Sequence, residues 1–532
     1  MASSAARRLL VTPFKGPMFM RTMINNQERI CVTSRGEEYS YGQLLKDSAS
    51  LAKTLNGGLP LMGERVGILF QPSYEFLTAI YATWRLGGCP VPLCPSHPEA
   101  EMEYFLQESQ ATHLVLSPDF KEQVQPILTR HRGLTPYLVE PFLCDVSLAR
   151  QRPLEDWECE CVRLQDSDRG LILFTSGTTG PPKGVVSTHG NLRSQITVLL
   201  QAWEWSKNDR ILNPLPLHHV HGLVNIVFCA LASGATCEFA GKFDPKSVWD
   251  AFARQSKKLT LFMAVPTIYS KLIIYYESLK DKELQKQYSQ GAHALRLMVS
   301  GSAALPQSVI SKWEKITGHM LLERYGMTEL GMAISNTIGR RVAGYVGSPL
   351  PGVECKIMDE RTYEEVPEGE PGELWVRGPS VFSEYFNRPE ATEQAFEDGF
   401  FKTGDIAVRE RGMYKILGRA SMDIIKSGGY KISALDIERV ISEHENVEEV
   451  VVLGVPSETF GEKIAAVVTL VDPEQKLHLS SLRRFCSDKL AAYKIPTLLR
   501  VVEEIPRNAM RKVNKRQLRE ELFSPPQEGE SS

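Results

Sequence analysis

The sequence predicts an α/β protein with a large N-terminal domain of αβ-layered subdomains, a small β subdomain and a small mobile α+β C-terminal domain. Three observations lead to this prediction. Apolar runs of strand length alternate with helical patterns in the N-terminal part, short β-like segments separated by Pro and Gly occupy residues 342–411, and a helix–strand–strand–helix pattern follows residue 419. At 532 residues the chain also exceeds what one hydrophobic core fills, so several structural units are expected.

The N-terminal part has the pattern of repeated strand–helix units. Apolar runs at residues 66–93 and 114–116 alternate with helical patterns such as residues 74–84. Residues 171–174 have the length and composition of a buried strand, and apolar side chains recur at helical spacing over residues 192–203. We therefore expect strand, loop and helix to follow one another in the order that a phosphate site at a helix N-terminus prefers.

Domain boundaries are expected where these patterns change. Residues 1–27 are a possible targeting segment, and residues 524–532 form a tail that is too polar to fold. Between them we expect a large N-terminal domain at residues 28–418, a hinge at residues 419–423 and a mobile C-terminal domain at residues 424–523.

The N-terminus has some properties of a mitochondrial presequence. Arg7, Arg8, Lys15 and Arg21 occur there, and no acidic residue precedes Glu28. This predicts a mitochondrial location. The alternative is the frayed basic terminus of a cytoplasmic protein, because the amphipathic stretch is short.

Composition indicates a small-molecule partner. The formal net charge is -3 with 42% hydrophobic residues, so nothing favours nucleic acid or an anionic membrane. The ten cysteines stand at irregular positions, which favours reduced thiols and predicts no structural metal. Residues 211–237 lack charged side chains, but prolines and histidines interrupt them, so we expect buried interior and no transmembrane segment. The oligomeric state is not readable from the sequence.

A loop suited to polyphosphate follows the predicted strand at residues 171–174. Glycines let the backbone approach a ligand, while hydroxyls and one cation can hold its oxygens. It is not a P-loop, because Lys183 is followed by Gly184 where a magnesium-binding Ser or Thr is required. The candidate ATP-binding residues of this loop are Thr175, Ser176, Gly177, Thr178, Thr179, Gly180 and Lys183.

Five motifs in order then carry a specific resemblance. They are the phosphate loop, residues 325–329 (Tyr-Gly-Met-Thr-Glu), residues 403–405 (Thr-Gly-Asp), residues 418–419 (Gly-Arg) and Lys512. The series resembles the adenylate-forming superfamily, which contains acyl-CoA synthetases, luciferases and the adenylation domains of peptide synthetases. The resemblance implies an acid–thiol ligase that uses ATP and CoA as co-substrates and Mg²⁺ as cofactor, with an acyl-AMP intermediate.

The resemblance also implies roles for individual residues. The loop residues would hold the β- and γ-phosphates, while Thr328 and Glu329 would contact the α-phosphate and Mg²⁺, with Glu329 as the metal ligand. Asp405 would bind the ribose hydroxyls with help from Arg419. The loop at residues 300–304 and Tyr325 would enclose the adenine. The candidate ATP-binding residues of these two segments are Gly301, Ser302, Ala303, Tyr325 and Gly326.

The resemblance implies that the C-terminal domain acts first in adenylation and then in the transfer to CoA. Lys512 would bridge the carboxylate and the α-phosphate during adenylation, although Arg511 stands where the family usually has glycine. After rotation of the domain, CoA would pass along residues that resemble the pantetheine tunnel. These are Lys426, Gly428, Gly429 and Tyr430.

The nature of the acid is suggested by Arg324, which lies where the family motif lines the acyl pocket. A buried unpaired guanidinium is costly, so such a site requires an anion, and the planar fork of arginine fits a second carboxylate. Ser302, His218 and His221 could assist. Together these residues resemble malonyl-CoA synthetases and imply malonate, with methylmalonate also possible. The alternatives are an ion pair of Arg324 with Glu323 or another local acid, and a role of the histidines in core packing or in a switch of domain contacts.

The expected function is therefore activation of malonate with ATP and its transfer to CoA, giving malonyl-CoA, AMP and pyrophosphate. A medium-chain fatty acyl-CoA synthetase, with Arg324 turned away from the pocket, is the first alternative. A non-catalytic acyl-adenylate or nucleotide sensor is the second, prompted by Arg511.

Overall fold

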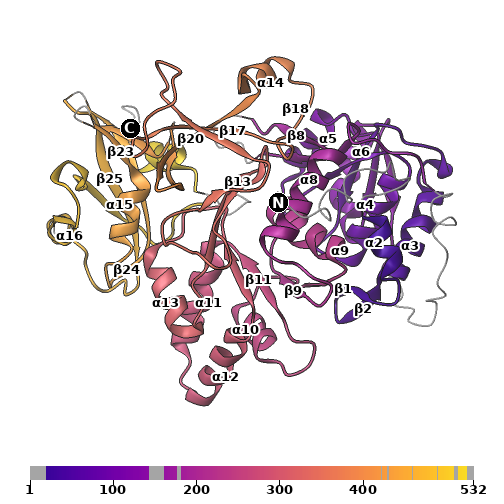
Figure 1. Cartoon of the computed structure of the whole chain (residues 1–532), viewed down its shortest axis with the longest axis horizontal. Coiled ribbons are helices and arrows are strands. Elements are labelled where there is room, and N and C mark those ends of the chain that lie inside the picture. Colours follow the sequence, from indigo (N-terminus) through magenta and orange to yellow (C-terminus); the bar gives the residue numbers. More distant parts are fainter. Residues whose placement is uncertain are drawn as a thin grey trace, which may run out of the picture.

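The computed structural model describes residues 19–142, 161–175, 181–420, 422–427, 430–457, 459–487, 489–507 and 513–523. It confirms a mixed α/β architecture with a large N-terminal region and a small C-terminal domain. In Figure 1 the C-terminal domain, drawn in yellow, lies on the side of the molecule opposite helices α4 (Tyr74–Arg85), α5 (Glu99–Glu108) and α6 (Lys121–Arg130). Within the described ranges, no helix has both the length and the apolar character needed to cross a membrane.

The largest sheet is mostly parallel in its centre and antiparallel at both edges. Its short central strands are almost entirely buried, as expected when helices cover both faces. In spatial order the strands are β15 (Ser348–Pro349), β14 (Gly331–Ser335), β13 (Leu322–Met327), β12 (Leu297–Ser300), β11 (Leu261–Ala264), β9 (Arg210–Asn213), β10 (Thr236–Phe239), β1 (Ile30–Ser34) and β2 (Glu37–Ser40).

Helices cover this sheet in two groups. One group packs together below the sheet in Figure 1 and consists of α10 (Pro245–Ala253), α11 (Pro266–Ser278), α12 (Lys282–His293) and α13 (Gln307–Thr317). The other group packs around a short π-helix, η4 (His221–Phe228), and consists of α2 (Met20–Asn25), α3 (Tyr41–Thr54), α8 (His189–Ala202) and α9 (Cys229–Ser233).

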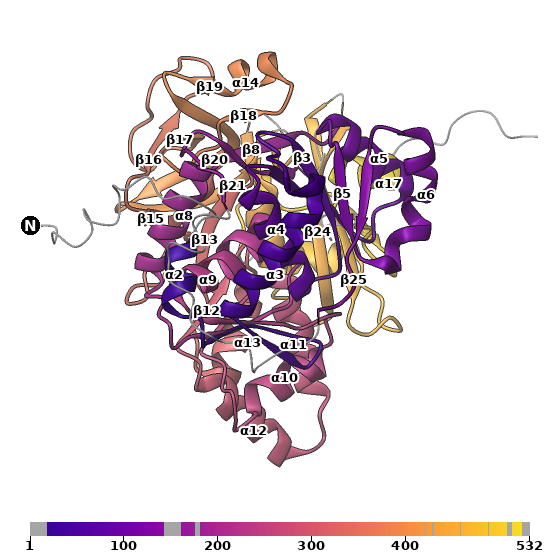
Figure 2. The ribbon, with the colours of Figure 1, turned by 90° about the vertical axis from the view of Figure 1, so that its right-hand side faces the viewer.

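The strand–helix units predicted over residues 66–93 and 114–116 form a separate parallel sheet. Figure 2 looks onto this part of the molecule. Its strands are β4 (Cys89–Pro92), β3 (Arg65–Leu69), β5 (His113–Leu116) and β6 (Thr135–Leu138), and its helices are α4 (Tyr74–Arg85), α5 (Glu99–Glu108) and α6 (Lys121–Arg130). Every residue of α4 is buried, because this helix contacts strands of both sheets.

The phosphate loop lies in a third, antiparallel sheet of β18 (Glu384–Tyr385), β8 (Gly184–Thr188) and β7 (Arg169–Phe174). The strand expected at residues 171–174 is confirmed. The expected order of strand, loop and helix is wrong, because the loop joins β7 to the antiparallel strand β8, and α8 begins only after β8. The N-terminus of α8 is instead closed by a capping box between Thr188 and Asn191.

The predicted β subdomain and C-terminal domain both form. The β subdomain is built from β16 (Glu354–Met358), β17 (Gly372–Arg377), β19 (Phe396–Glu397), β20 (Phe400–Glu410) and β21 (Met413–Arg419), with α14 (Pro389–Ala395) beside it. The C-terminal domain contains β22 (Ile424–Ser427), β23 (Tyr430–Ser433), α15 (Ala434–Ile441), β24 (Val447–Ser457), β25 (Gly461–Leu470), α16 (Leu479–Ser487), β26 (Leu498–Val501) and α17 (Lys515–Phe523).

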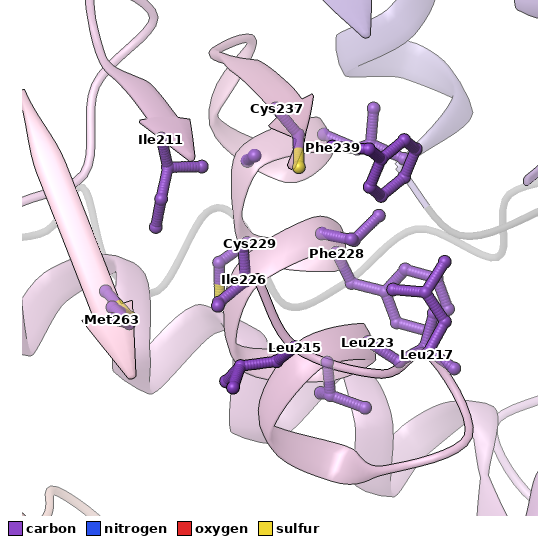
Figure 3. Close-up of a cluster of buried hydrophobic side chains, with 14 of the residues drawn as sticks. Ile211, Leu215, Leu217, Leu223, Ile226, Phe228, Cys229, Cys237, Phe239 and Met263 are labelled. Atoms are coloured by element: carbon purple, nitrogen blue, oxygen red, sulfur yellow. The ribbon is translucent and has the colours of Figure 1, made fainter. Parts of the chain in front are cut away.

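The uncharged stretch of residues 211–237 lies in the main core, as predicted. Figure 3 shows side chains from β9, η4, α9 and β10 packed together around this stretch, among them Leu223, Ile226 and Phe228. The π-helix begins at His221, and irregular helices of this kind are frequent at functional sites. The core therefore holds residues 218–221, which contain three histidines, against the sheet.

Candidate active site

A cavity of about 1320 Å³ lies between the N-terminal region and the C-terminal domain. Strand ends of β7, β12, β13, β20 and β21 open into it, and α15 contributes from the C-terminal side. The predicted residues that line it are Thr175, Lys183, His218, His221, Gly301, Ser302, Ala303, Arg324, Tyr325, Gly326, Thr328, Glu329, Asp405 and Arg419. The structure thus gathers motifs that are far apart in the sequence.

Other predicted residues are not part of this cavity lining. Lys426 lies on β22, and the exposed ring of Tyr430 on β23 stacks on Tyr493 with centroids 4.2 Å apart. Residues 176–180, 428–429 and 508–512 lie outside the described residues, so Ser176, Gly177, Thr178, Thr179, Gly180, Gly428, Gly429 and Lys512 have no described position.

The carboxylate of Asp405 is oriented by neighbouring side chains at the cavity wall. Asp405 and Arg419 face each other across β20 and β21, and Arg419 Nε lies 2.9 Å from Asp405 Oδ1. The hydroxyl of Tyr325 donates to the other carboxylate oxygen, and Arg419 Nη1 also donates to the carbonyl oxygen of Thr403 at 2.7 Å. An oriented carboxylate of this kind is suited to accept hydrogen bonds from a diol such as ribose.

The ends of the phosphate loop are tied together. The backbone N–H of Thr175 donates to the Lys183 carbonyl at 3.0 Å, and the Lys183 N–H donates to Thr175 Oγ1 at 3.0 Å. The ammonium of Lys183 lies 4.7 Å from the centroid of the Tyr385 ring. A cation on an aromatic face is held in place without losing its charge, so Lys183 stays available to an anion.

Tyr385 also connects this loop to Glu329, a role that sequence reasoning missed. Its hydroxyl donates to Glu329 Oε1 at 3.0 Å. Nothing near Tyr385 in the sequence marks it as a site residue. Its position comes from the pairing of β18 with β8, which sets Tyr385 opposite Val185 just after the loop.

The donors around Glu329 fit a hard divalent cation. Glu329 is buried at the cavity wall, and burial raises the pKa of its carboxyl group. A cation would favour the ionised form, and Thr328 lines the same wall with a second oxygen donor. Oxygen ligands of this type are those that Mg²⁺ prefers.

Two replacements of Tyr385 test its contacts with Glu329 and Lys183 separately. Because its hydroxyl favours the ionised form of Glu329, we expect Tyr385→Phe to raise the pKa of Glu329 further and to weaken the binding of a divalent cation at Glu329 about tenfold, the effect of losing one hydrogen bond to a charged group. Tyr385→Leu should additionally weaken the binding of an anion at Lys183, because it removes the ring beneath the ammonium. The measurement is the Mg²⁺ concentration that gives half-maximal activity, as a function of pH.

Tyr414→Phe is the matched control. The hydroxyl of Tyr414 donates to the Cys355 carbonyl in the β subdomain, away from the cavity. If Tyr385→Phe and wild type share the same Mg²⁺ requirement and pH profile, Tyr385 does not position Glu329.

The guanidinium of Arg324 is buried in the cavity wall. Its side chain is on β13, and the residue is 4% exposed. Nη2 donates to Ser302 Oγ at 3.4 Å, while Nε is buried and has no hydrogen-bond partner among the described residues. Burial lowers the pKa of Arg324 to about 9. A cation in this setting is stabilised by an anion that enters the cavity.

The backbone beside Arg324 is shaped around it. A Cβ atom on Gly301 would come within 2.5 Å of Arg324 Nε and Cζ, so only glycine lets the guanidinium lie against the chain. Ser302 has a positive φ of 71°, an uncommon conformation for a side-chain-bearing residue. Strained backbone of this kind is found at ligand-binding sites.

The local ion pair considered as an alternative for Arg324 does not form in the described structure. Glu323 precedes Arg324 on the strand, so its side chain points to the opposite face. There Glu323 Oε1 accepts the backbone N–H of Gly344 at 3.0 Å. The described residues offer Arg324 no carboxylate partner.

The two predicted histidines differ in their surroundings. His221 Nδ1 lies 3.2 Å from Ser302 Oγ, and burial together with the charge of Arg324 lowers its pKa well below the usual value. His221 is therefore neutral beside the arginine. His218 lies instead among other imidazoles, with ring centroids 5.7 Å from His97 and 4.4 Å from His219.

Glu323 gives the protein a testable pH dependence. Burial raises the pKa of Glu323 to about 7 from an ordinary value of 4.5. The folded state therefore holds a proton that the unfolded chain releases, so this contribution to stability is complete below about pH 4.5 and is lost as pH rises through about 7. As pH rises between these limits, the free energy of unfolding should fall less in Glu323→Gln than in wild type, by up to about 3 kcal/mol.

The measurement compares apparent thermal midpoints of wild type and Glu323→Gln across this pH range. The glutamine keeps an acceptor for Gly344 and cannot titrate. Parallel pH curves for the two proteins would contradict a raised pKa at Glu323.

The fold and this site define an AMP-binding enzyme, and the chain belongs to that family. The model of the AMP-binding enzyme family matches residues 19–386, and that of the AMP-binding enzyme C-terminal domain matches residues 436–512. Among characterised relatives, malonate–CoA ligase ACSF3, mitochondrial, of Mus musculus is 42% identical over 95% of this chain and 91% of its own length. Malonate–CoA ligase of Arabidopsis thaliana is also 42% identical, over 94% of this chain and 87% of its own.

Two solved structures superpose on nearly the whole chain. The crystal structure of ATP-bound MatB from Rhodopseudomonas palustris superposes with a TM-score of 0.83 at 32% identity, covering 94% of this chain and 98% of that one. O-succinylbenzoate coenzyme A synthetase from Bacillus subtilis, in complex with ATP and magnesium ion, superposes with a TM-score of 0.79 at 26% identity, covering 95% and 100%.

Proposed function

We propose that this protein is an ATP-dependent malonate–CoA ligase. One malonate carboxylate oxygen bonds to the α-phosphorus of ATP and pyrophosphate leaves, giving malonyl-AMP. The CoA thiol then bonds to the acyl carbon and AMP leaves. The observation that carries the choice of acid is the buried guanidinium of Arg324, which has no carboxylate partner in the described structure and lies beside Ser302 in the cavity.

The geometry suggests how the acid is bound. Arg324 and Ser302 would hold the distal carboxylate, with neutral His221 accepting or donating one further hydrogen bond to Ser302. This leaves the other carboxylate free to face the phosphates. Since methylmalonate adds only one methyl group, we propose it as a second, weaker substrate.

The nucleotide end would use the groups already described. Asp405 would accept the ribose hydroxyls, and Arg419 keeps that carboxylate oriented. Lys183 and the loop at residues 175–183 would hold the outer phosphates. Mg²⁺ bound at Glu329, with Thr328 nearby, would neutralise phosphate charge.

The C-terminal domain would supply the remaining groups. We propose that Lys512 assists adenylation and that Lys426, Gly428, Gly429 and Tyr430 line the path of CoA after a rotation about residues 419–423. In the present arrangement Lys426 and Tyr430 lie away from the cavity, which supports a need for such a rotation.

A substrate screen tests the proposal. AMP formation is measured with ATP, CoA and one acid at a time: malonate, methylmalonate, succinate and octanoate. We expect malonate to give the highest kcat/KM. Turnover with octanoate alone would establish the medium-chain alternative, and no pyrophosphate–ATP exchange with any acid would establish a sensor.

We further propose a mitochondrial location, supported by the basic N-terminus and by relatives named as mitochondrial. Met20 and Met23 of α2 are buried in the main core. A removable leader would therefore end before Met20, and not at residue 27. Fusion of residues 1–19 to a fluorescent protein, followed by imaging, tests this.

A further inference from the structure

A cluster of soft metal-ligand groups lies on the cavity wall outside the adenylation machinery. Cys94 and His97 belong to the segment between β4 and α5, and His218 belongs to the segment between β9 and η4. One potential ligand atom from each residue lies within 4.8 Å of the others. The sequence did not predict this group, because more than a hundred residues separate its two parts.

The imidazoles of the cluster are in a state that can bind metal. His97 Nδ1 and His218 Nε2 are buried and have no hydrogen-bond partner among the described residues. Buried polar atoms are nearly always satisfied, so two such nitrogens in one cluster need an explanation. Burial lowers the pKa of both histidines, which keeps the rings neutral with lone pairs available.

The segment that carries Cys94 and His97 is held in place. The backbone N–H of His97 donates to the Cys94 carbonyl at 3.1 Å and closes a turn. The side-chain amide of Gln123 donates to the carbonyl oxygens of Pro95 and His97 at 3.3 and 3.4 Å. Cys94 Sγ lies 3.1 Å from Ser96 Oγ, so the thiol is oriented as well.

We propose that Cys94, His97 and His218 bind a zinc-class divalent ion. One thiolate and two imidazoles suit Zn²⁺, and three protein ligands leave a fourth position open. Bond lengths of about 2.0–2.3 Å place the ligands of a tetrahedral ion roughly 3.5 Å apart. Since the three ligand atoms all lie within 4.8 Å of one another, each pair must approach by at most roughly 1.3 Å. Binding releases the Cys94 proton to solvent.

The metal site would be open to the active-site cavity. Cys94 and His218 both line that cavity, whereas His97 lies behind them. The open coordination position would therefore face the cavity. The cluster is distinct from the oxygen donors at Glu329, because thiolate and imidazole select soft or borderline ions and not Mg²⁺.

Metal binding is tested on the purified full-length chain without ATP, which would itself bind the ion. Zn²⁺ is titrated in competition with a chromophoric chelator, with Mg²⁺ in excess. We expect one equivalent to bind, and Cys94→Ser and His97→Gln each to weaken it at least about tenfold, the minimum usual even for loss of an outer-shell partner. Co²⁺ should give a thiolate-to-metal charge-transfer band that Cys94→Ser lacks.

Matched controls are Cys355→Ser and His478→Gln, which remove a thiol and an imidazole far from the cluster and should bind as wild type does. If a cluster variant does not fold, Zn²⁺ protection of Cys94 from alkylation in wild type is measured by mass spectrometry. Equal Zn²⁺ affinity in wild type and both cluster variants, or alkylation of Cys94 that Zn²⁺ does not slow, overturns the proposal.

Discussion

Replacement of Arg324 by alanine is expected to lower kcat/KM for malonate by about 30- to 4,000-fold and to leave ATP affinity nearly unchanged. Loss of one partner from a buried, hydrogen-bonded charge pair costs about 2–5 kcal/mol, which corresponds to this range. ATP binding should be unaffected because, in the proposed binding mode, the ribose would contact Asp405 and the outer phosphates would contact Lys183, and not Arg324. Initial rates of AMP formation give kcat/KM for malonate, and equilibrium binding gives the affinity for ATP.

Two further variants make the result specific. Arg324→Lys keeps the charge but loses the planar fork, so it should recover only part of the activity. Arg341→Ala removes another partly buried arginine, which donates to the Met320 carbonyl outside the cavity, and should retain full activity. Equal malonate kinetics in Arg324→Ala and wild type would remove Arg324 from the binding site. A gain of activity toward octanoate in Arg324→Ala would support a pocket that excludes fatty chains by charge.

Replacement of Lys512 by alanine is expected to lower the adenylation rate by about 10²–10³-fold, the usual cost of removing one preorganised group that stabilises developing charge. Lys512 lies outside the described residues. Arg507 and Val513, which bracket its segment, pair with each other and line the cavity. Pyrophosphate–ATP exchange with malonate present measures this half-reaction.

The second half-reaction provides the contrast. CoA added to synthetic malonyl-AMP should give malonyl-CoA at a similar rate in Lys512→Ala and wild type, because the proposed rotation removes this lysine from the site. Arg511→Gly restores the residue usual in the family and should retain or raise the exchange rate. Loss of both half-reactions in Lys512→Ala would indicate a folding defect or a different role.

The sequence predicted the fold well where a local pattern decides it. The buried strand at residues 171–174, the fully buried helix α4 and the C-terminal α+β domain all depend on hydrophobic periodicity within a few residues. The helix predicted over residues 192–203 is confirmed as α8, but it does not follow the phosphate loop directly. Residues 184–188 form an antiparallel strand with β7 between the loop and the helix, and this pairing has no signature in a single segment.

The same difference between local motifs and contacts of distant segments applies to the candidate site. Glu329, Asp405 and Arg419 could be identified because ordered motifs carry them, and the structure brings them to one cavity. Tyr385 could not, since its role arises from strand pairing between β18 and β8. His218 was placed with the acyl site, but in space it adjoins Cys94 and His97.

The sequence by itself indicated the class of reaction, because five motifs that resemble those of adenylate-forming enzymes occur in order along the chain. Only the tertiary structure decided that Arg324 has no carboxylate partner among the described residues. Glu323 faces away from Arg324 and bonds to Gly344, which leaves the guanidinium to a ligand. The physical reason is that burial and pairing are properties of packed neighbours from distant segments, and a linear pattern does not contain them.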